Sequence, residues 1–330
     1  MQVNGVRALT YSEIRTWKQC RYRHNLSYVQ RFAANEKASY FKRGSAVHRF
    51  IELMHTQTEP VVIDTLIKQL RREWEDAIAY EFYLLHDEKE ELPALSDDDK
   101  EEMAVLEGMI RAYHKHYFLN NEFAGYLAEI EVSATIGDAV SWAKIDGIVK
   151  LKRQLDAYWI HEIKTAKSFS ETDRKLLNID DQSHHYLMTV QEKWPDKKFA
   201  GAIRTIIKAP GIKQTKKESV DEYCERVVAD YQERPDFYLS RFYLDKPKQV
   251  VEEYRNYFQT IYKEIVLSTF APKSPGIQSC GMCDFFEYCT EPDEQVKDEL
   301  LKRDFYVRGS THSAAPILND QNVQQNRRVA

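Results

Sequence analysis

The first third of the chain carries the hydrophobic spacing of α-helices. From residue 10 to about 120, apolar side chains recur every three or four positions, the period of a helix with one buried face. The segment 10–13, TYSE, has the Thr and Glu spacing of a capping box and predicts a helix start. Longer amphipathic patterns cover 61–86 and 98–119. In 43–55, one stripe holds four apolar residues: Val47, Phe50, Ile51 and Met54.

Beyond residue 120 the spacing changes to that of strands. Four segments predict strands, at 126–136, 140–151, 157–165 and 200–208. Gly137-Asp138 fits a turn between the first two strands. Further patterns predict helices over about 181–194, 217–233 and 247–268, and a short strand over 236–244. This order predicts the fold class α/β: a mixed β-sheet flanked by helices, with a helical N-terminal region.

Length and composition indicate one large globular domain. We expect it to cover residues 1–308, with a helical insertion at about 57–122 and a cysteine-containing region at 272–292. The tail 309–330 is polar and rich in Asn, Gln and Ser, so we expect it to be disordered. No apolar run approaches the ~18 residues of a membrane span, and the first residues lack the apolar stretch of a signal peptide. A cytoplasmic protein is expected, in which cysteines are metal ligands or free thiols more often than disulfides.

The formal net charge of −5 hides an uneven distribution. Residues 1–50 hold ten Lys and Arg against two Asp and Glu, whereas residues 51–130 hold seven against nineteen. Residues 196–217 are again basic, with seven against one. Two basic segments on an acidic body can form a track for a polyanion, although solvated helix and loop faces explain such runs more simply.

The segment 157–165, AYWIHEIKT, combines strand character with charge. Glu162 and Lys164 share one strand face, about 7 Å apart. A carboxylate and an ammonium near a core are costly unless they have a function. Asp146 can face the same side if its strand pairs with this one, and two carboxylates there suit Mg²⁺ or Mn²⁺. A Glu162–Lys164 salt bridge on a half-exposed sheet is the equally open alternative.

Three other polar residues have informative spacing. His48 follows Gly44 by four positions and falls on the polar side of its helix, although a single histidine is usually structural. Gln182 and Tyr186 share one face of the helix after the E-x-K strand, because they are four residues apart. A glutamine there can bind a phosphate or a base, and a tyrosine can stack or donate.

The cysteines give the most specific pattern. A C-x2-C-x5-C group is followed closely by the end of the expected domain, and one further cysteine lies 260 residues before its first member. The residues are Cys280, Cys283 and Cys289, with Cys20 as the distant one. Four thiols can bind an iron–sulfur cluster or a zinc ion. Cys224 lies on a helical pattern and is expected not to take part.

Taken together, these residues resemble the RecB-type branch of the PD-(D/E)XK nucleases that carry a 4Fe–4S cluster. That branch includes CRISPR-associated RecB-like exonucleases, the AddB nuclease domain and phage-encoded exonucleases. Its order is an N-terminal Cys, G-x-x-x-H, an acidic residue, G-x-(I/V)-D, E-x-K, Q-x-x-x-Y and a cysteine triplet. The order matches over roughly 20–290, with Glu131 as the acidic residue and Glu129 on the same face. One departure is Lys144, which stands where the family often has Gly.

The resemblance implies a restriction-endonuclease-like fold and a role for each residue. The divalent metal would be bound by His48, Asp146, Glu162 and the carbonyl of Ile163. Lys164 would position or activate the attacking water, and Gln182 and Tyr186 would orient the DNA and brace the site. A 4Fe–4S cluster, with zinc as the alternative, would tie the N-terminal helix to the C-terminal segment through four ligands: Cys20, Cys280, Cys283 and Cys289.

The implied activity is an Mg²⁺- or Mn²⁺-dependent DNA exonuclease acting on single strands or duplex ends. Two alternatives are a catalytically silent DNA-binding module and a zinc-stapled structural protein. Contacts to the phosphate backbone are expected from five basic residues: Arg204, Lys208, Lys213, Lys216 and Lys217. The chain has no G-x-x-x-x-G-K-(S/T) motif for a helicase motor, so a helicase, recombinase or single-strand-binding protein is a candidate partner.

Overall fold

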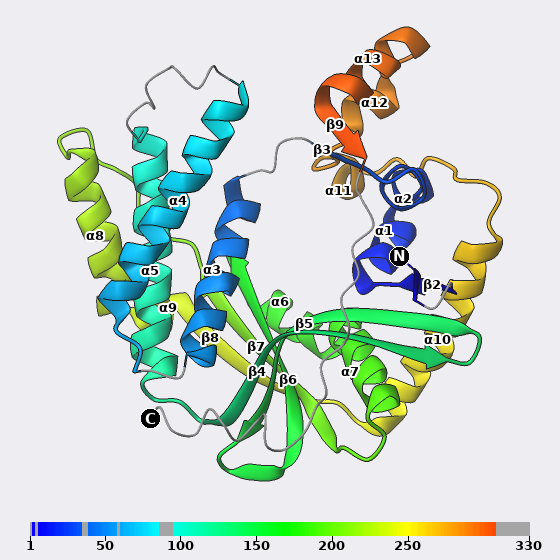
Figure 1. The fold of residues 1–330 in the computed structure, drawn as a ribbon, viewed down its shortest axis with the longest axis horizontal. Helices are drawn as coiled ribbons and strands as arrows, with labels where there is room; N and C mark the ends of the chain where they lie inside the picture. The colour runs from blue at the N-terminus through cyan, green and yellow to red at the C-terminus, as the bar shows by residue number, and fades with distance from the viewer. Residues whose placement is uncertain (1, 4–5, 35–38, 58–59, 86–94, 308–330) are drawn as a thin grey trace.

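The computed structural model describes residues 2–3, 6–34, 39–57, 60–85 and 95–307, so the expected disordered tail lies outside the described residues. Its centre is a seven-stranded mixed sheet (Figure 1). The order is β1 (Gln2–Val3), β2 (Val6–Leu9), β5 (Ala139–Leu151), β6 (Gln154–Ala166), β7 (Phe199–Lys208) and β8 (Leu239–Asp245), with β4 (Phe123–Ile136) also paired to β5. The β2–β5 and β6–β7 pairs are parallel and the other pairs are antiparallel.

The alternating segments form the strands that the sequence predicts. β4 and β5 are joined at Gly137-Asp138, and Gly137 has a φ of +60°, a conformation that glycine adopts without strain. The segment at 236–244 differs from the prediction because its first residues form a short helix, α9 (Pro235–Tyr238). Proline at the first position of α9 lacks a donor that the helix start would leave unsatisfied anyway.

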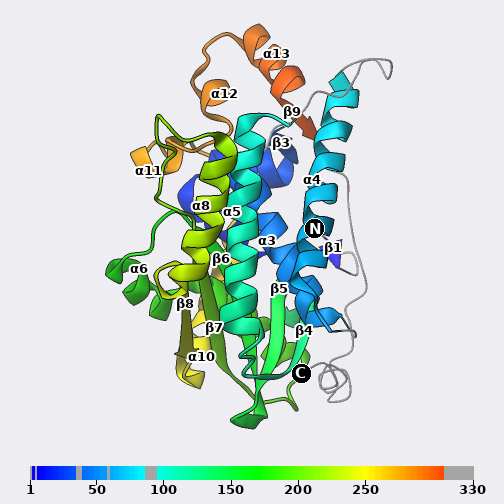
Figure 2. The same cartoon turned by 90° about the vertical axis from the view of Figure 1, so that its left-hand side faces the viewer.

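Helices cover both faces of the sheet. One face packs against α1 (Tyr11–Gln19), α7 (Asp181–Lys193) and α10 (Lys248–Leu267), which bury a continuous apolar core with β4, β5 and β6. The other face packs against α3 (Ser39–Thr56), α4 (Ile63–Leu85), α5 (Asp97–Tyr113) and α8 (Val220–Glu233). Figure 2 shows that the long helices α4, α5 and α8 lie near one another and run in similar directions.

The expected helical insertion is therefore part of the main fold. α5 packs closely on α8, and a side chain at Gly108 would place its Cβ 2.4 Å from the ring of Tyr231. The buried stripe predicted for α3 is present, and it joins the same core as Ile163 and Ile207 from the sheet. A π-helical turn, η2 (His114–Phe118), extends α5 toward the start of β4.

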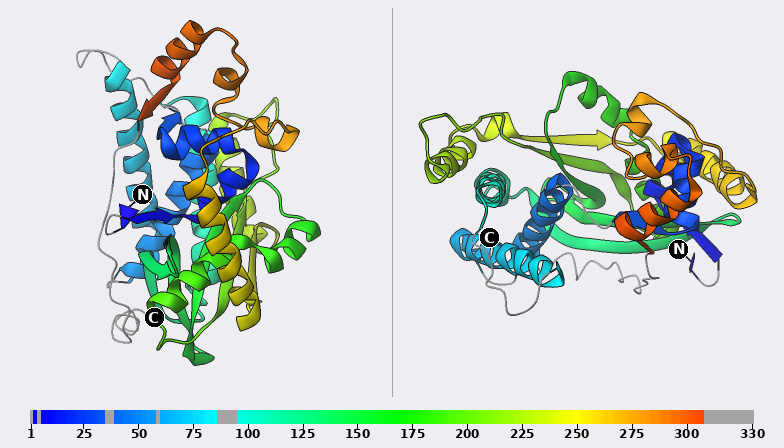
Figure 3. Two further views of the ribbon diagram at one scale, coloured as in Figure 1. Left: turned by 90° about the vertical axis from the view of Figure 1, so that its right-hand side faces the viewer. Right: turned by 90° about the horizontal axis from the view of Figure 1, so that it is seen from above.

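The segments 20–34 and 277–307, from near the two ends of the described chain, lie side by side (Figure 3). β3 (Phe32–Ala34) pairs with β9 (Phe305–Val307), and Leu26, Phe285 and Phe305 form a small core. The other short elements here are α2 (Arg21–His24), η1 (Asn25–Val29), α11 (Ile277–Cys280), α12 (Phe286–Thr290) and α13 (Glu294–Asp304). Strands as short as β3 and β9 give no readable alternation in the sequence.

The start of α1 differs in part from the predicted capping box. Thr10 caps α1 by accepting from the Glu13 N–H, as the capping box predicts, but the Glu13 carboxylate pairs with Arg7 and His24. A buried ion pair therefore replaces the second half of the box.

No helix in the described part of the chain is long and apolar enough to cross a membrane.

Candidate active site

The candidate site lies where two neighbouring strands part. The ladder between β5 and β6 runs from Leu151 and Gln154 to its last rung, Gly147 and His161. Beyond that rung, β5 continues with β4, and β6 continues with β7. Asp146 and Glu162 are the first residues past the rung. Asp146 also accepts a hydrogen bond of 2.8 Å from the Ile163 N–H, which keeps both strands in contact across the opening.

A break in strand alternation presents two carboxylates to α3. The β4–β5 ladder pairs Ala128 with Gly147 and Ile130 with Ile145, while Glu129 between them has a φ of +48°. Leu127 and Ile130 both contact the core under α7, although strict alternation would put them on opposite faces. A non-glycine residue in this region is strained, and such strain is often found at functional sites.

Three ligand atoms meet at this break. His48 Nδ1 lies 3.3 Å from Asp146 Oδ1, and one ligand atom each of His48, Glu129 and Asp146 lie within 4.8 Å of one another. Gly44 lies one turn before His48, and a Cβ there would already sit 3.4 Å from Thr165 Oγ1. The backbone of α3 at Gly44 therefore lies close to Thr165 of β6. Glu129, rather than Glu131, is the upstream acidic residue that joins the group.

Glu162 is more buried than Asp146, with 1 % of its surface exposed. Its Oε2 accepts 3.0 Å from Gln182 Nε2 and lies 3.5 Å from Lys164 Nζ. Gln182 also donates to the hydroxyl of Tyr186 at 3.0 Å, so the two residues of the Q-x-x-x-Y pair brace the carboxylate together. Glu162 Oε1 is buried and has no hydrogen-bond partner among the described residues. A buried carboxylate oxygen without a donor is costly unless a cation binds it.

The charges in the opening influence one another. Burial opposes ionisation of Asp146, but the hydrogen bond from His48 and the charges of His48 and Lys164 outweigh it, so the pKa of Asp146 is lowered. Burial lowers the pKa of His48, but Asp146 more than compensates and the pKa is raised. Burial and the nearby Asp146 carboxylate raise the pKa of Glu162 to about 7.

These residues fit a hard divalent cation. Carboxylate oxygens and one imidazole nitrogen are ligands that Mg²⁺ or Mn²⁺ accepts. The unpartnered Glu162 Oε1 and the close group of His48, Glu129 and Asp146 supply the donors. Lys144, the departure from the family pattern, pairs with Glu129 instead of Asp146. The Ile163 N–H is beside Asp146, and ligation by the Ile163 carbonyl stays a prediction.

Glu162→Gln should stabilise the metal-free protein at pH 8. The folded-state pKa of about 7 exceeds the usual 4.5, so ionised Glu162 destabilises the fold increasingly as pH rises between these values. Removing the charge should raise the melting temperature in EDTA by roughly 2 °C or more. At pH 4.5 or below the carboxyl is largely neutral, and the gain should vanish. Thermal unfolding at both pH values tests this. An equal fall of the melting temperature at both would show that the buried charge of Glu162 does not destabilise the fold.

The basic residues expected at DNA fall into two groups. Arg204 is only 4 % exposed and pairs with Asp180 at the start of α7. It faces the interior beside Glu162 in the β6–β7 ladder, so it is not a surface contact in this structure. Lys208 is half-buried over the ring of Phe237. The remaining three, Lys213, Lys216 and Lys217, are exposed on the segment between β7 and α8.

The cysteine segments are brought together at the paired chain ends. The Tyr22 N–H donates to the Pro272 carbonyl at 3.1 Å, just after Cys20. Burial raises the pKa of the Cys283 thiol, and the nearby Cys20 adds to this shift. Cys224 lies apart on α8, where its thiol donates to the Lys100 carbonyl. Among the described residues, the cysteine sulfurs do not form a group as close as that of His48, Glu129 and Asp146.

A known protein family matches most of the chain. The family model of the PD-(D/E)XK nuclease superfamily matches residues 8–290. A crystal structure of a "Putative exonuclease" from Eubacterium rectale is 12 % identical with a TM-score of 0.47, and the alignment covers 87 % of this chain and 90 % of that one. No curated protein matches the sequence significantly.

Proposed function

Because the chain belongs to the PD-(D/E)XK nuclease superfamily, we propose that it is a divalent-metal-dependent DNA exonuclease acting on single strands or duplex ends. The observation that supports this most is the opening between β5 and β6. It places an imidazole and two carboxylates, those of His48, Glu129 and Asp146, within 4.8 Å of one another, beside the Glu162–Lys164 pair of the neighbouring strand. One oxygen of Glu162 is buried and has no donor among the described residues. A structural salt bridge between Glu162 and Lys164 does not require the other members of this group.

Each residue has a defined task in hydrolysis. His48, Glu129, Asp146 and Glu162 would hold Mg²⁺ or Mn²⁺, which supplies positive charge that acidifies water and neutralises the phosphate. Lys164 Nζ, next to Glu162, would orient the attacking water and stabilise negative charge on the phosphate oxygens. The Gln182–Tyr186 pair keeps Glu162 in place.

The four cysteines at the joined chain ends would hold one 4Fe–4S cluster as a structural staple. Cys20 adds to the raised pKa of the Cys283 thiol. Cys280 ends the short helix α11, and Cys289 lies in the short helix α12. Soft thiolates are the ligands of such clusters, and four of them also suit zinc. The cluster would secure the contact between α2, η1 and the C-terminal segment without taking part in hydrolysis.

DNA binding should weaken strongly with salt and show no sequence preference. Exposed lysines at 213, 216 and 217 and the basic first fifty residues favour contacts with phosphates. If several phosphates are neutralised, affinity should fall roughly a hundredfold or more between 50 and 200 mM salt. Fluorescence anisotropy with two unrelated single strands measures this. A flat salt profile would contradict binding through the phosphate backbone.

A cytoplasmic helicase, recombinase or single-strand-binding protein would suit as a partner that delivers such strands.

The activity is tested on a panel of labelled DNAs. Linear single strands labelled at the 5′ or the 3′ end, circular single strands and blunt duplexes are incubated with Mg²⁺ or Mn²⁺. The proposal expects loss of linear single strands or duplex ends, with circles intact. Cleavage of circles would show that the protein is an endonuclease and not an exonuclease. No cleavage of any substrate would support the catalytically silent alternative.

A further inference from the structure

We propose that Tyr126 is a positioning residue for the metal site. Its phenol holds Gly147 and His161, the last rung of the β5–β6 ladder, and thereby fixes where Asp146 and Glu162 stand. This inference rests on the proposed metal-binding function, since it concerns the position of two of the proposed ligands. Tyr126 lies on β4, three residues before Glu129, and is 3 % exposed.

The contact between Tyr126 and Gly147 leaves no room for a side chain. A Cβ built on Gly147 would lie 2.5 Å from the Tyr126 hydroxyl oxygen and 2.6 Å from the ring carbon that bears it. The glycine after Asp146 is therefore required for space, because the phenol fills the position that a side chain would take. Any shift of the phenol moves the backbone that carries Asp146.

The same hydroxyl is tied to the neighbouring strand. Tyr126 Oη and His161 Nδ1 are hydrogen-bonded at 3.0 Å, and His161 Nε2 and Thr205 Oγ1 at 2.8 Å. Thr205 Oγ1 also accepts from Arg241 Nε at 3.0 Å, and Arg241 donates to Glu122. The line of bonds crosses from β4 to β8 through His161, the residue before Glu162. Burial and the Arg241 charge lower the pKa of His161.

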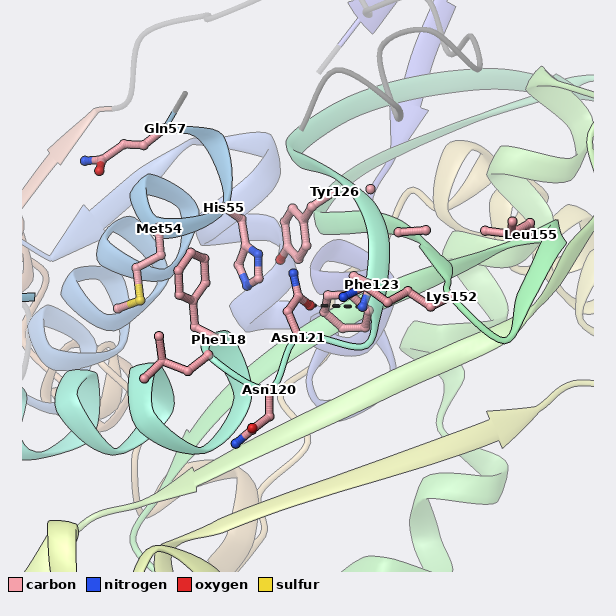
Figure 4. A pocket seen from close by; sticks show the side chains of 13 residues that line it. Met54, His55, Gln57, Phe118, Asn120, Asn121, Phe123, Tyr126, Lys152 and Leu155 are labelled. Atoms are coloured by element: carbon pink, nitrogen blue, oxygen red, sulfur yellow. Dashed lines mark hydrogen bonds between the residues drawn. The ribbon is translucent and has the colours of Figure 1, made fainter. Parts of the chain in front are cut away.

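The other side of the Tyr126 ring is closed by α3. His55 stacks on it with ring centroids 4.1 Å apart and 7° between the planes, as the neighbouring rings in Figure 4 show. His55 Nε2 is hydrogen-bonded to the Tyr113 hydroxyl at 2.9 Å, away from β5 and β6. Outside these rings lies a cavity of about 660 Å³ that His55, Phe123 and Tyr126 help to line (Figure 4). The phenol is thus clamped between α3 and the last rung.

If Tyr126 had only a structural role, replacing it would lower the stability of the protein but leave its affinity for the metal unchanged. Two variants separate these roles, because each removes one buried hydroxyl from a tyrosine–histidine bond. Tyr126→Phe breaks the bond that reaches the last rung, whereas Tyr113→Phe breaks the bond to His55 and removes no direct contact with Gly147 or His161. Both should lower the melting temperature, since each leaves a buried histidine nitrogen without its partner.

The test is a titration of the metal-free protein with Mn²⁺, followed by electron paramagnetic resonance well below the melting temperature. Tyr126→Phe should weaken Mn²⁺ binding about tenfold, the usual range for residues that support metal ligands. Tyr113→Phe should stay within about twofold of the natural protein. Equal affinity in Tyr126→Phe and the natural protein, or equal losses in both variants, would overturn the inference.

The experiment also covers two further outcomes: a natural protein that binds no Mn²⁺, and a Tyr126→Phe variant that does not fold. If the natural protein binds no Mn²⁺, the proposed metal site itself fails, independently of Tyr126. If Tyr126→Phe does not fold, Thr205→Val is measured instead, because it removes the second partner of His161 and leaves the phenol in place. It should also weaken Mn²⁺ binding several-fold, and an unchanged affinity would overturn the inference.

Discussion

Replacing Asp146 with Asn should reduce DNA cleavage by at least about a thousandfold, because several kcal/mol of metal-dependent stabilisation are lost. The amide keeps the size of the carboxylate but carries no charge for the metal and weakens the pairing with His48. Glu162→Ala should have a similar effect. Both variants should lose Mn²⁺ binding in the same titration, and far-ultraviolet circular dichroism should show that the fold persists.

Lys164→Ala is the matched control for these two variants. Lys164 is not a proposed ligand, so this variant should lose cleavage while it still binds Mn²⁺. The three substitutions together separate holding the metal from using it. Cleavage at near the natural rate in Asp146→Asn or Glu162→Ala would show that the opening between β5 and β6 is not the active site.

Replacing Cys20 with Ser should remove the proposed cluster and lower the melting temperature by roughly 5 °C or more. A covalent staple between residues 20 and 280 closes a very long loop, which in a simple entropy model is worth at most on the order of 5 kcal/mol. The gain is smaller here, because β3–β9 pairing and the core of Leu26, Phe285 and Phe305 already join the ends. Thermal unfolding of anaerobically purified protein measures the loss, and cleavage should fall only indirectly.

Cys224→Ser provides the comparison, since its thiol lies on α8 and bonds to the Lys100 carbonyl. It should keep iron, sulfide and the broad absorption near 400 nm that a 4Fe–4S cluster gives. Stoichiometric zinc without iron, in protein made with ample iron, would overturn the cluster but not the staple. Loss of metal in Cys224→Ser would overturn the assignment of the four ligands.

The sequence predicts the centre of the fold well because strong periodic signals lie there. The long alternating runs become β4, β5, β6 and β7, and the stripe of Val47, Phe50, Ile51 and Met54 becomes the buried face of α3. The spacing of Asp146, Glu162 and Lys164 also identifies residues that the structure brings together. Local periodicity and hairpin pairing are enough to place them.

Other features depend on contacts between segments that are distant in the chain. Glu129 comes close to His48 and Asp146 because a φ of +48° breaks strand alternation, which no periodic pattern indicates. Arg204 looks like a surface cation in a basic segment, yet it is buried on β7, where Asp180 pairs with its charge. The role of Gly147 becomes apparent only when Tyr126 from another strand is seen to occupy the space beside it.

The most direct test of the central claim is cleavage of an end-labelled linear single strand in Mn²⁺ and in EDTA. The natural protein and Asp146→Asn, purified side by side, are compared over the same time course. We expect the natural protein to shorten the strand with Mn²⁺, stop in EDTA and resume when Mn²⁺ is restored, while Asp146→Asn leaves the strand intact throughout. Equal shortening by both proteins, or shortening that persists in EDTA, would contradict it.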